Sequence, residues 1–206
     1  ADCTTGIWLI MNMIEAKIKG VYVIHAAEEV GCKGSRALVA DDPEWLRHID
    51  AVISFDRFGD KSVITHQMGL RTASEEFARS FADALYMSQL VADDGGSYTD
   101  SNEYASVVSE CTNISVGYYG QHGVNETQDL VYAEFLCDSL VNADWDMLLF
   151  RRDPAVVEDT WGDWGVSGSG TDEDNIEALK TMIQDHPHKV AELLDGWGVK
   201  YYALME

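Results

Sequence analysis

The stretch Thr4–His25, TTGIWLIMNMIEAKIKGVYVIH, predicts a helix followed directly by a buried strand. Its first part, up to Lys17, can be capped by a threonine and carries apolar side chains at helical spacing, at Ile7, Ile10, Met11 and Ile14. Gly20 ends the turn, and Val21–His25 is short and rich in β-branched residues, as buried strands are. A helix that leads into a buried strand is typical of α/β proteins.

The same alternation continues along the chain. Ala51–Phe55 and Asn113–Tyr118 are predicted as buried strands, and a loop with Gly31 and Gly34 precedes the first of them. Helices are predicted from Ser74 onward, over Ser101–Val108 and over Glu126–Asn142, whose core-facing residues would be Leu130, Ala133, Phe135, Leu136 and Leu140. This order predicts an α/β fold, with a mixed, mostly parallel sheet and helices on both faces.

The domain organisation follows from a change of composition after Asp153. Residues 1–153 form the predicted catalytic domain. Residues 154–175 form the predicted linker, because they contain a segment rich in glycine, serine and acids. Residues 176–206 are predicted to form a helical tail.

The charge of the chain is strongly negative, with 14 basic and 36 acidic side chains and a formal net charge of −22. Such a surface repels phosphate backbones and anionic lipid, so nucleic-acid and membrane partners are not expected. Four scattered cysteines, Cys3, Cys32, Cys111 and Cys137, include no CxxC pair and favour a reducing compartment. We therefore expect a cytoplasmic protein whose cysteines are small buried side chains.

Charged or metal-ligating residues follow each predicted strand. Glu28 and Glu29 come after the first strand, Asp56 directly follows the second, and His122 follows the third. Asp2 lies just before the first helix. Because ligands in such sheets bind at the carboxyl ends of the strands, these side chains are expected at one edge. Carboxylates together with an imidazole are the ligands of a zinc site that keeps an open position.

The motifs around these residues resemble the di-zinc, co-catalytic aminopeptidase family, which includes glutamate carboxypeptidase-like and glutaminyl cyclase-like relatives. The phrase Glu28–Ser35, EEVGCKGS, is similar to its double-glutamate motif, and Asp2, four residues before Gly6, resembles its bridging aspartate. Asp56 resembles its second aspartate ligand and His122 its final histidine ligand. The motifs agree in order from residue 2 to about residue 142.

The resemblance implies a three-layer aminopeptidase/phosphorylase-like sandwich and a role for each residue. Asp2 would bridge two metal ions, Glu29 and His122 would complete one site, and Asp56 would belong to the other. Glu28 would be the general base of a zinc-dependent exopeptidase that hydrolyses the N-terminal bond of a peptide substrate through a metal-activated water. One or two zinc ions are implied, with cobalt or manganese as substitutes.

Two departures from the family pattern concern the metal site and the oxyanion. The family's upstream histidine ligand would precede Ala1, so the resemblance implies a domain truncated at its amino terminus, and His25 is the nearest substitute in sequence. Gln121 stands where several relatives have a tyrosine before the final histidine. Further candidates for substrate binding are Arg57, Tyr119 and Asp100.

The sequence leaves two alternatives to an active exopeptidase. The first is a metal-binding fragment whose site is incomplete. Such a fragment would need an upstream segment, or a second copy in a homo-oligomer, to complete the site. The second alternative is a metal-dependent amidohydrolase or cyclase that acts on a non-peptide amide.

Overall fold

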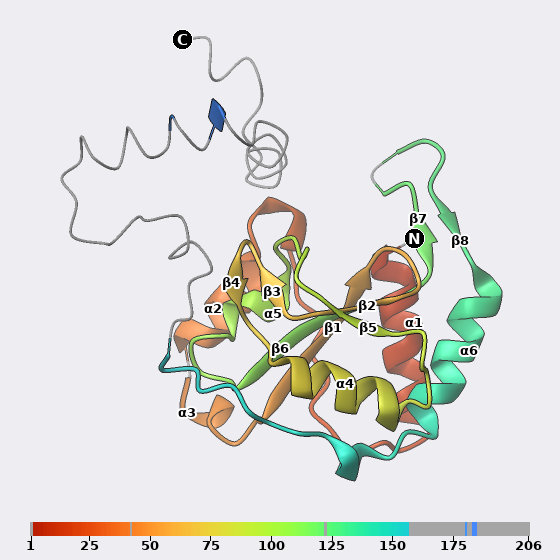
Figure 1. Cartoon of the computed structure of the whole chain (residues 1–206), viewed down its shortest axis with the longest axis horizontal. Coiled ribbons are helices and arrows are strands. Elements are labelled where there is room, and N and C mark those ends of the chain that lie inside the picture. The colour runs from red at the N-terminus through yellow and green to blue at the C-terminus, as the bar shows by residue number, and fades with distance from the viewer. Residues whose placement is uncertain (1, 42, 122, 157–179, 181–182, 185–206) are drawn as a thin grey trace.

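The fold centres on a four-stranded sheet with the strand order β1-β6-β2-β5. The computed structural model describes residues 2–41, 43–121, 123–156, 180 and 183–184 (Figure 1). The strands are β1 (Ala51–Arg57), β2 (Ser62–Ile64), β5 (Val91–Asp93) and β6 (Glu110–Ser115). β1 is parallel to β6 and β2 is parallel to β5, whereas β2 and β6 are antiparallel. The predicted mixed, mostly parallel sheet is confirmed.

Helices cover both faces of this sheet and give three layers (Figure 1). One face packs against α1 (Asp2–Glu15), α4 (Glu75–Ala84) and α6 (Leu130–Val141), in a core that includes Leu9, Phe77 and Leu136. The other face packs against α2 (Lys33–Asp41), α3 (Pro43–Leu46) and α5 (Asp100–Glu103), around Leu46 and Tyr104. The smaller elements are the 3₁₀ helices η1 (Glu28–Val30) and η2 (Trp145–Met147) and two ribbons, β3 (His66–Gln67) with β4 (Leu70–Arg71) and β7 (Tyr118–Tyr119) with β8 (Thr127–Gln128).

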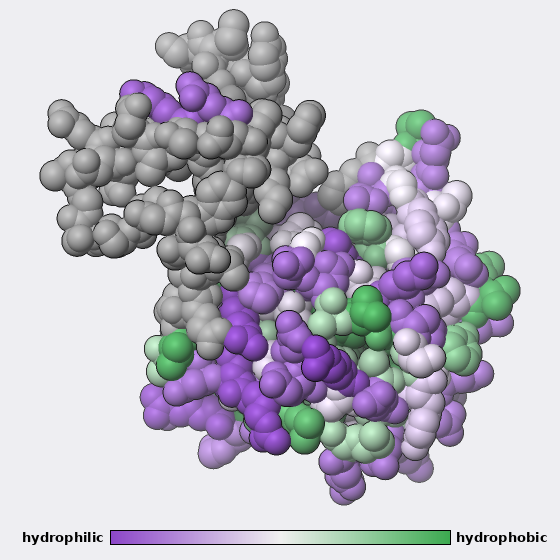
Figure 2. Space-filling view, in the orientation of Figure 1, coloured by the Kyte–Doolittle hydropathy of each residue, from purple (hydrophilic) through white to green (hydrophobic). Residues whose placement is uncertain are grey.

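The outer surface agrees with the acidic composition. Figure 2 shows hydrophilic side chains over most of one face, with hydrophobic residues scattered among them. None of the helices in the described part of the chain combines the length and the apolarity needed to cross a membrane.

The two long helices of one layer begin at side-chain caps. The Ser74 hydroxyl accepts a hydrogen bond from the Phe77 N–H, as the sequence predicts for the start of α4. The carboxylate of Asp129 accepts from the Tyr132 N–H, so α6 begins at Leu130 rather than at the predicted Glu126. Residues before this cap pair in β8 instead, and this pairing sets the boundary.

Several predicted elements differ from the structure. Val21–His25 forms no strand, because a strand needs a paired neighbour and no described strand lies beside this run. The predicted loop with Gly31 and Gly34 contains η1 and then α2. The helix predicted over Ser101–Val108 is the four-residue α5 followed by turns, and the third predicted strand begins three residues earlier, as β6.

The apolar stripe predicted for the first helix does not face the core. Leu9 and Met13 are the buried apolar residues of α1, whereas Met11 is 62% exposed and Ile14 is 51% exposed. The helix carries apolar side chains on several of its faces, so their periodicity does not identify which face packs against the core. Similarly, α6 buries Ala133, Leu136 and Leu140 but exposes Leu130 and Phe135.

Burial of the cysteines, which the sequence predicts, is confirmed for three of the four. Cys32, Cys111 and Cys137 are buried free thiols, but Cys3 is exposed on α1. The boundary predicted at residue 153 stays a prediction, since residues 157–179 and most of the predicted tail lie outside the described residues.

Close packing of α1 on β1 depends on Gly6. A Cβ atom at this position would lie 2.4 Å from the carbonyl oxygen of Phe55. We predict that Gly6→Ala lowers the free energy of unfolding by ~1–3 kcal/mol, although alanine favours helix formation. Gly20→Ala is the matched control, because its nearest atom would be 3.8 Å away. Urea denaturation measures both variants, and equal midpoints would contradict the prediction.

Candidate active site

The two consecutive glutamates lie on the short turn η1, between α1 and α2. Ala27 before the turn and Gly31 after it both have left-handed backbone conformations, with φ of 63° and 95°. These two conformations reverse the chain within a few residues. Glu28 and Glu29 therefore lie together on a tight turn, and both line a cavity of about 690 Å³.

Asp56 lines the same cavity from the carboxyl end of β1. Its backbone N–H donates to Asn113 Oδ1 at 3.0 Å, and its carbonyl accepts from the Tyr118 hydroxyl at 3.1 Å. Its Oδ2 accepts from the Thr99 hydroxyl at 3.3 Å. Three of the predicted residues, Glu28, Glu29 and Asp56, thus line the same cavity.

Asp100 connects both ends of the turn that carries the glutamates. Its Oδ1 accepts a hydrogen bond from the Ser35 hydroxyl at 2.6 Å, and its Oδ2 lies 3.2 Å from Nδ1 of His25. His25 precedes η1 and Ser35 follows it, so one carboxylate fixes the turn from both sides. Burial alone raises the pKa of Asp100, but the donors on His25 and Ser35 favour the charged form and bring its pKa below the usual value.

His25 is engaged at both ring nitrogens. Its Nε2 lies 2.5 Å from the hydroxyl oxygen of Tyr104, while its Nδ1 faces Asp100. Burial, followed by the charge of Asp100, raises the pKa of Tyr104 to about 12, so this hydroxyl is protonated at neutral pH. In this arrangement both ring nitrogens of His25 have partners, and His25 supports the turn; a metal role for His25 stays a prediction.

Cys32 links Glu28 to the network around Asp100. Its sulfur lies 4.0 Å from Oε1 of Glu28, and its side chain is buried. Burial, and then the carboxylates of Asp100 and Glu28, raise the pKa of the Cys32 thiol, which therefore stays neutral. No motif in the sequence indicates this role of Cys32 or the roles of Ser35 and Thr99, because nothing in their spacing relates them to Asp100 or Asp56.

The other two candidate substrate residues lie in different surroundings. Arg57 donates to the Gly95 carbonyl at 3.0 Å, and its guanidinium lies over the ring of Phe58, 4.2 Å from the centroid. The Nη2 atom of Arg57 also lies 3.6 Å from Oδ2 of Asp93, so the Arg57 side chain points toward the end of β5 and the loop that follows it. Tyr119 is 42% exposed on β7, close in sequence to His122.

The described residues supply part of a metal site. No three histidine, cysteine, aspartate or glutamate side chains in this part of the chain converge to hold an ion. Glu29 and Asp56 line the cavity, and carboxylates are ligands that suit zinc. The side chain of Asp2 and all of His122 lie outside the described residues, so their convergence with Glu29 stays a prediction.

The Asp100 contacts predict a pH-dependent stability. Its pKa is lowered in the folded state, so its contribution is present above the unfolded pKa of ~3.9 and is lost as the pH falls through the folded value. We predict that Asp100→Asn costs ~1.5–3 kcal/mol near pH 7 and progressively less as the pH falls through the lowered pKa of the folded state. Thermal unfolding against pH measures this, with exposed Asp83→Asn on α4 as the control. A difference independent of pH would contradict the assignment.

Comparison with known proteins gives one family. The model of peptidase family M28 matches residues 10–129. No curated protein and no solved structure matches the chain. The matched residues include the glutamate turn, Asp56, Asp100 and the position of His122. Because the match covers more than half of the chain, the protein belongs to peptidase family M28, a family of zinc metallopeptidases.

Proposed function

We propose that the protein is a zinc-dependent exopeptidase that removes the amino-terminal residue of a peptide, with Glu28 as the general base. The observation that carries this proposal is the shared cavity of Glu28, Glu29 and Asp56. Three carboxylates in the lining of one cavity favour a cationic ligand, and a metal ion or a peptide ammonium group is such a ligand.

The chemistry assigned to Glu28 is a proton transfer. Its carboxylate would take a proton from the attacking water and give it to the leaving amine, so it ends the cycle unprotonated. Zinc, when bound, would acidify this water and polarise the scissile carbonyl. Asp100 would be a positioning residue. It contacts His25 and Ser35 on either side of η1 and would thereby fix the orientation of the turn that carries the two glutamates.

The ligand assignment follows the family order. Asp2, Glu29 and His122 would hold one ion, and Asp2 and Asp56 would contribute to a second. The residues assigned to the second set, Asp2 and Asp56, are carboxylates, and carboxylates alone bind zinc less firmly than a set that includes imidazole. We expect one firmly held ion per chain, with cobalt or manganese as substitutes, and a second ion that is lost on dialysis.

The proposal also includes the expectations from charge and cysteine content. The substrate would be a peptide rather than a nucleic acid or a membrane lipid, because the net charge of −22 repels anions. The free thiols favour the cytoplasm.

Hydrolysis of aminoacyl-anilides with added zinc or cobalt tests the proposal, together with metal analysis by mass spectrometry after dialysis. Release of the anilide, dependent on metal and blocked when the amino group is acetylated, is the expected result. Metal binding without hydrolysis would favour the incomplete fragment. Turnover of only non-peptide amides would favour the amidohydrolase or cyclase.

A further inference from the structure

A β-bulge lies at the end of β1, where Asp56 and Arg57 follow each other. Ser54 is opposite Asn113 and Arg57 is opposite Ser115, so β1 has one more residue than β6 in this stretch. The Asn113 side chain accepts the hydrogen bond of the Asp56 N–H. Bulges near active sites redirect side chains. Asp56 lines the cavity of the candidate site, whereas Arg57 points to the loop between β5 and α5.

Arg57 holds this β5–α5 loop, residues 94–99, at its beginning. The Nη2 atom of Arg57 donates to the Gly95 carbonyl at 3.0 Å and lies 3.6 Å from Oδ2 of Asp93. Asp93 in turn accepts hydrogen bonds from the Gly95 N–H at 2.8 Å and from the Ser62 hydroxyl. Burial alone raises the pKa of Asp93, but these two donors and the charge of Arg57 bring its pKa below the usual value, so a carboxylate faces the guanidinium.

The middle of the β5–α5 loop packs closely against β3. The Gly96 N–H donates to the His66 carbonyl, and the Met68 N–H donates to the Gly96 carbonyl, both at 3.1 Å. A Cβ atom at Gly96 would lie 2.2 Å from the His66 carbonyl oxygen and 2.4 Å from Cγ2 of Ile64. The two backbones are thus in direct contact, and close-packed groups transmit a displacement rather than absorb it.

The end of the same loop contacts both carboxylate-bearing elements of the candidate site. Thr99 is 2% exposed, and its hydroxyl donates to Oδ2 of Asp56 at 3.3 Å. The next residue, Asp100, contacts His25 and Ser35 on either side of η1. One short loop therefore connects Asp56 on β1 with the turn that carries the two glutamates.

We propose that Arg57 is a positioning residue rather than a ligand of the substrate. By holding the β5–α5 loop on the end of β1, it fixes Thr99 against Asp56 and Asp100 against the glutamate turn. This coupling stands on the contacts of the loop, and only its consequence for catalysis rests on the proposed function.

NMR of the full chain tests the coupling without any activity. Arg57→Met removes the charge and the donors but keeps much of the apolar stem. The imidazole resonances of His25 should shift, although the loop contacts of Arg57 lie at the other end of the loop. The Gly96 amide should exchange on the order of tenfold faster, whereas the Val91 amide, which donates to Lys61, should be unchanged. Unshifted His25 resonances in the folded variant would overturn the proposal.

Two further variants keep this test decisive, even where Arg57→Met does not fold. Arg57→Lys keeps the charge opposite Asp93 but lacks the planar fork of donors, so it should give the same changes with a smaller amplitude. Arg79→Met is the charge control, because Arg79 forms an exposed pair with Glu75 on α4. It should leave His25 unchanged. Equal shifts in the Arg57 and Arg79 variants would overturn the proposal, since they would reflect charge alone.

Steady-state kinetics on an aminoacyl-anilide separate positioning from substrate binding. Misplaced groups should lower kcat on the order of 10–100-fold in Arg57→Met, with KM nearly unchanged, and Arg57→Lys should recover part of the loss. A rise in KM alone would overturn the proposal in favour of a substrate contact by Arg57. Should the unmodified chain hydrolyse nothing, the proposed function fails, and the His25 resonances still decide the coupling.

Discussion

Glu28→Gln is expected to reduce kcat on the order of 10²–10⁴-fold, the usual cost of removing a general base, while the metal content stays nearly unchanged. Glutamine keeps the shape of the side chain but cannot accept the proton of the attacking water. The variant also preserves the backbone of η1 and the hydrogen bonds of Asp100 to His25 and Ser35. The measurement pairs kcat on an aminoacyl-anilide with metal analysis of the same sample.

Glu29→Gln is the informative partner of this variant. Glu29 is assigned as a ligand, so its replacement should lower metal affinity, and added zinc should recover part of the activity. Glu44→Gln is the neutral control, because Glu44 is an exposed residue on α3 that forms a surface ion pair with nearby Arg47. Equal loss of metal and activity in Glu28→Gln would show that the roles of the two glutamates are exchanged.

Local signals in the sequence predict the elements that form by local interactions. The Ser74 cap and the spacing of Phe77 and Phe81 predict α4, and both phenylalanines are fully buried. The β-branched run that begins at Ala51 predicts β1 almost to the residue. The cap and spacing of α4 involve neighbours close in sequence, and the continuous apolar run indicates β1, although β1 pairs with the distant β6.

Long-range interactions account for the elements that were predicted wrongly. Val21–His25 has the composition of a strand, but pairing depends on a neighbour and not on the run itself. Gly34 favoured a loop, yet it lies in α2. A Cβ atom at this position would lie 2.7 Å from the Ala26 carbonyl oxygen, so the position requires glycine. Only the folded structure shows that this glycine is needed for close packing rather than for a turn.

The candidate site divides in the same way. Residues that follow strands are predictable, because strand ends in such sheets meet at one edge, and Glu28, Glu29 and Asp56 do share a cavity. The support of the turn by Asp100 joins residues 65 and 75 positions apart, and no motif in the sequence indicates it. The roles of Asp2 and His122 stay predictions of the family resemblance.

A carboxylate far from the candidate active site is expected to matter most for stability. Glu110 is fully buried at the start of β6. Its carboxylate accepts hydrogen bonds from the N–H and hydroxyl groups of Ser74 and from the backbone N–H groups of Arg151 and Arg152. One side chain thus joins the central sheet, the cap of α4 and the segment after η2, and no motif in the sequence singles it out.

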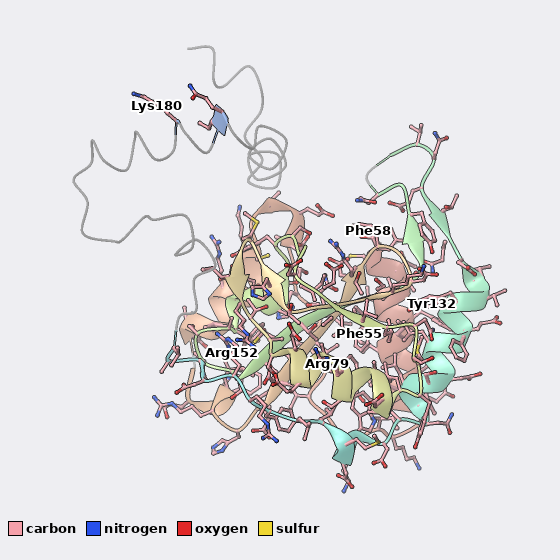
Figure 3. All side chains as sticks on the ribbon, viewed as in Figure 1. Phe55, Phe58, Arg79, Tyr132, Arg152 and Lys180 are labelled. Carbon is pink, nitrogen blue, oxygen red and sulfur yellow. The ribbon has the colours of Figure 1, made fainter. Side chains whose placement is uncertain are left out.

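Arg152 strengthens the same junction from the other side (Figure 3). Its guanidinium donates to the carbonyl groups of Ala105 at 2.6 Å, Val108 at 3.0 Å and Ser109 at 2.9 Å, and to that of Arg71 at 2.9 Å. The segment that carries it is therefore fixed by its backbone at Glu110 and by its side chain at the turn before β6. Loss of the Glu110 carboxylate would release the first of these attachments.

Glu110→Ala is expected to lower the free energy of unfolding by ~3–5 kcal/mol, because it leaves buried donors without an acceptor. That is a large part of the ~5–15 kcal/mol typical of a domain, so the variant should unfold at a much lower urea concentration. Glu110→Gln keeps one acceptor oxygen and should cost less. The exposed control Glu75→Gln, which loses only a surface pair with Arg79, should change stability by under about 1 kcal/mol. A loss in Glu110→Ala no larger than that of the control would mean that water replaces the carboxylate, and that the segment after η2 is held by Arg152 and by the Leu149 N–H bond to Ser80.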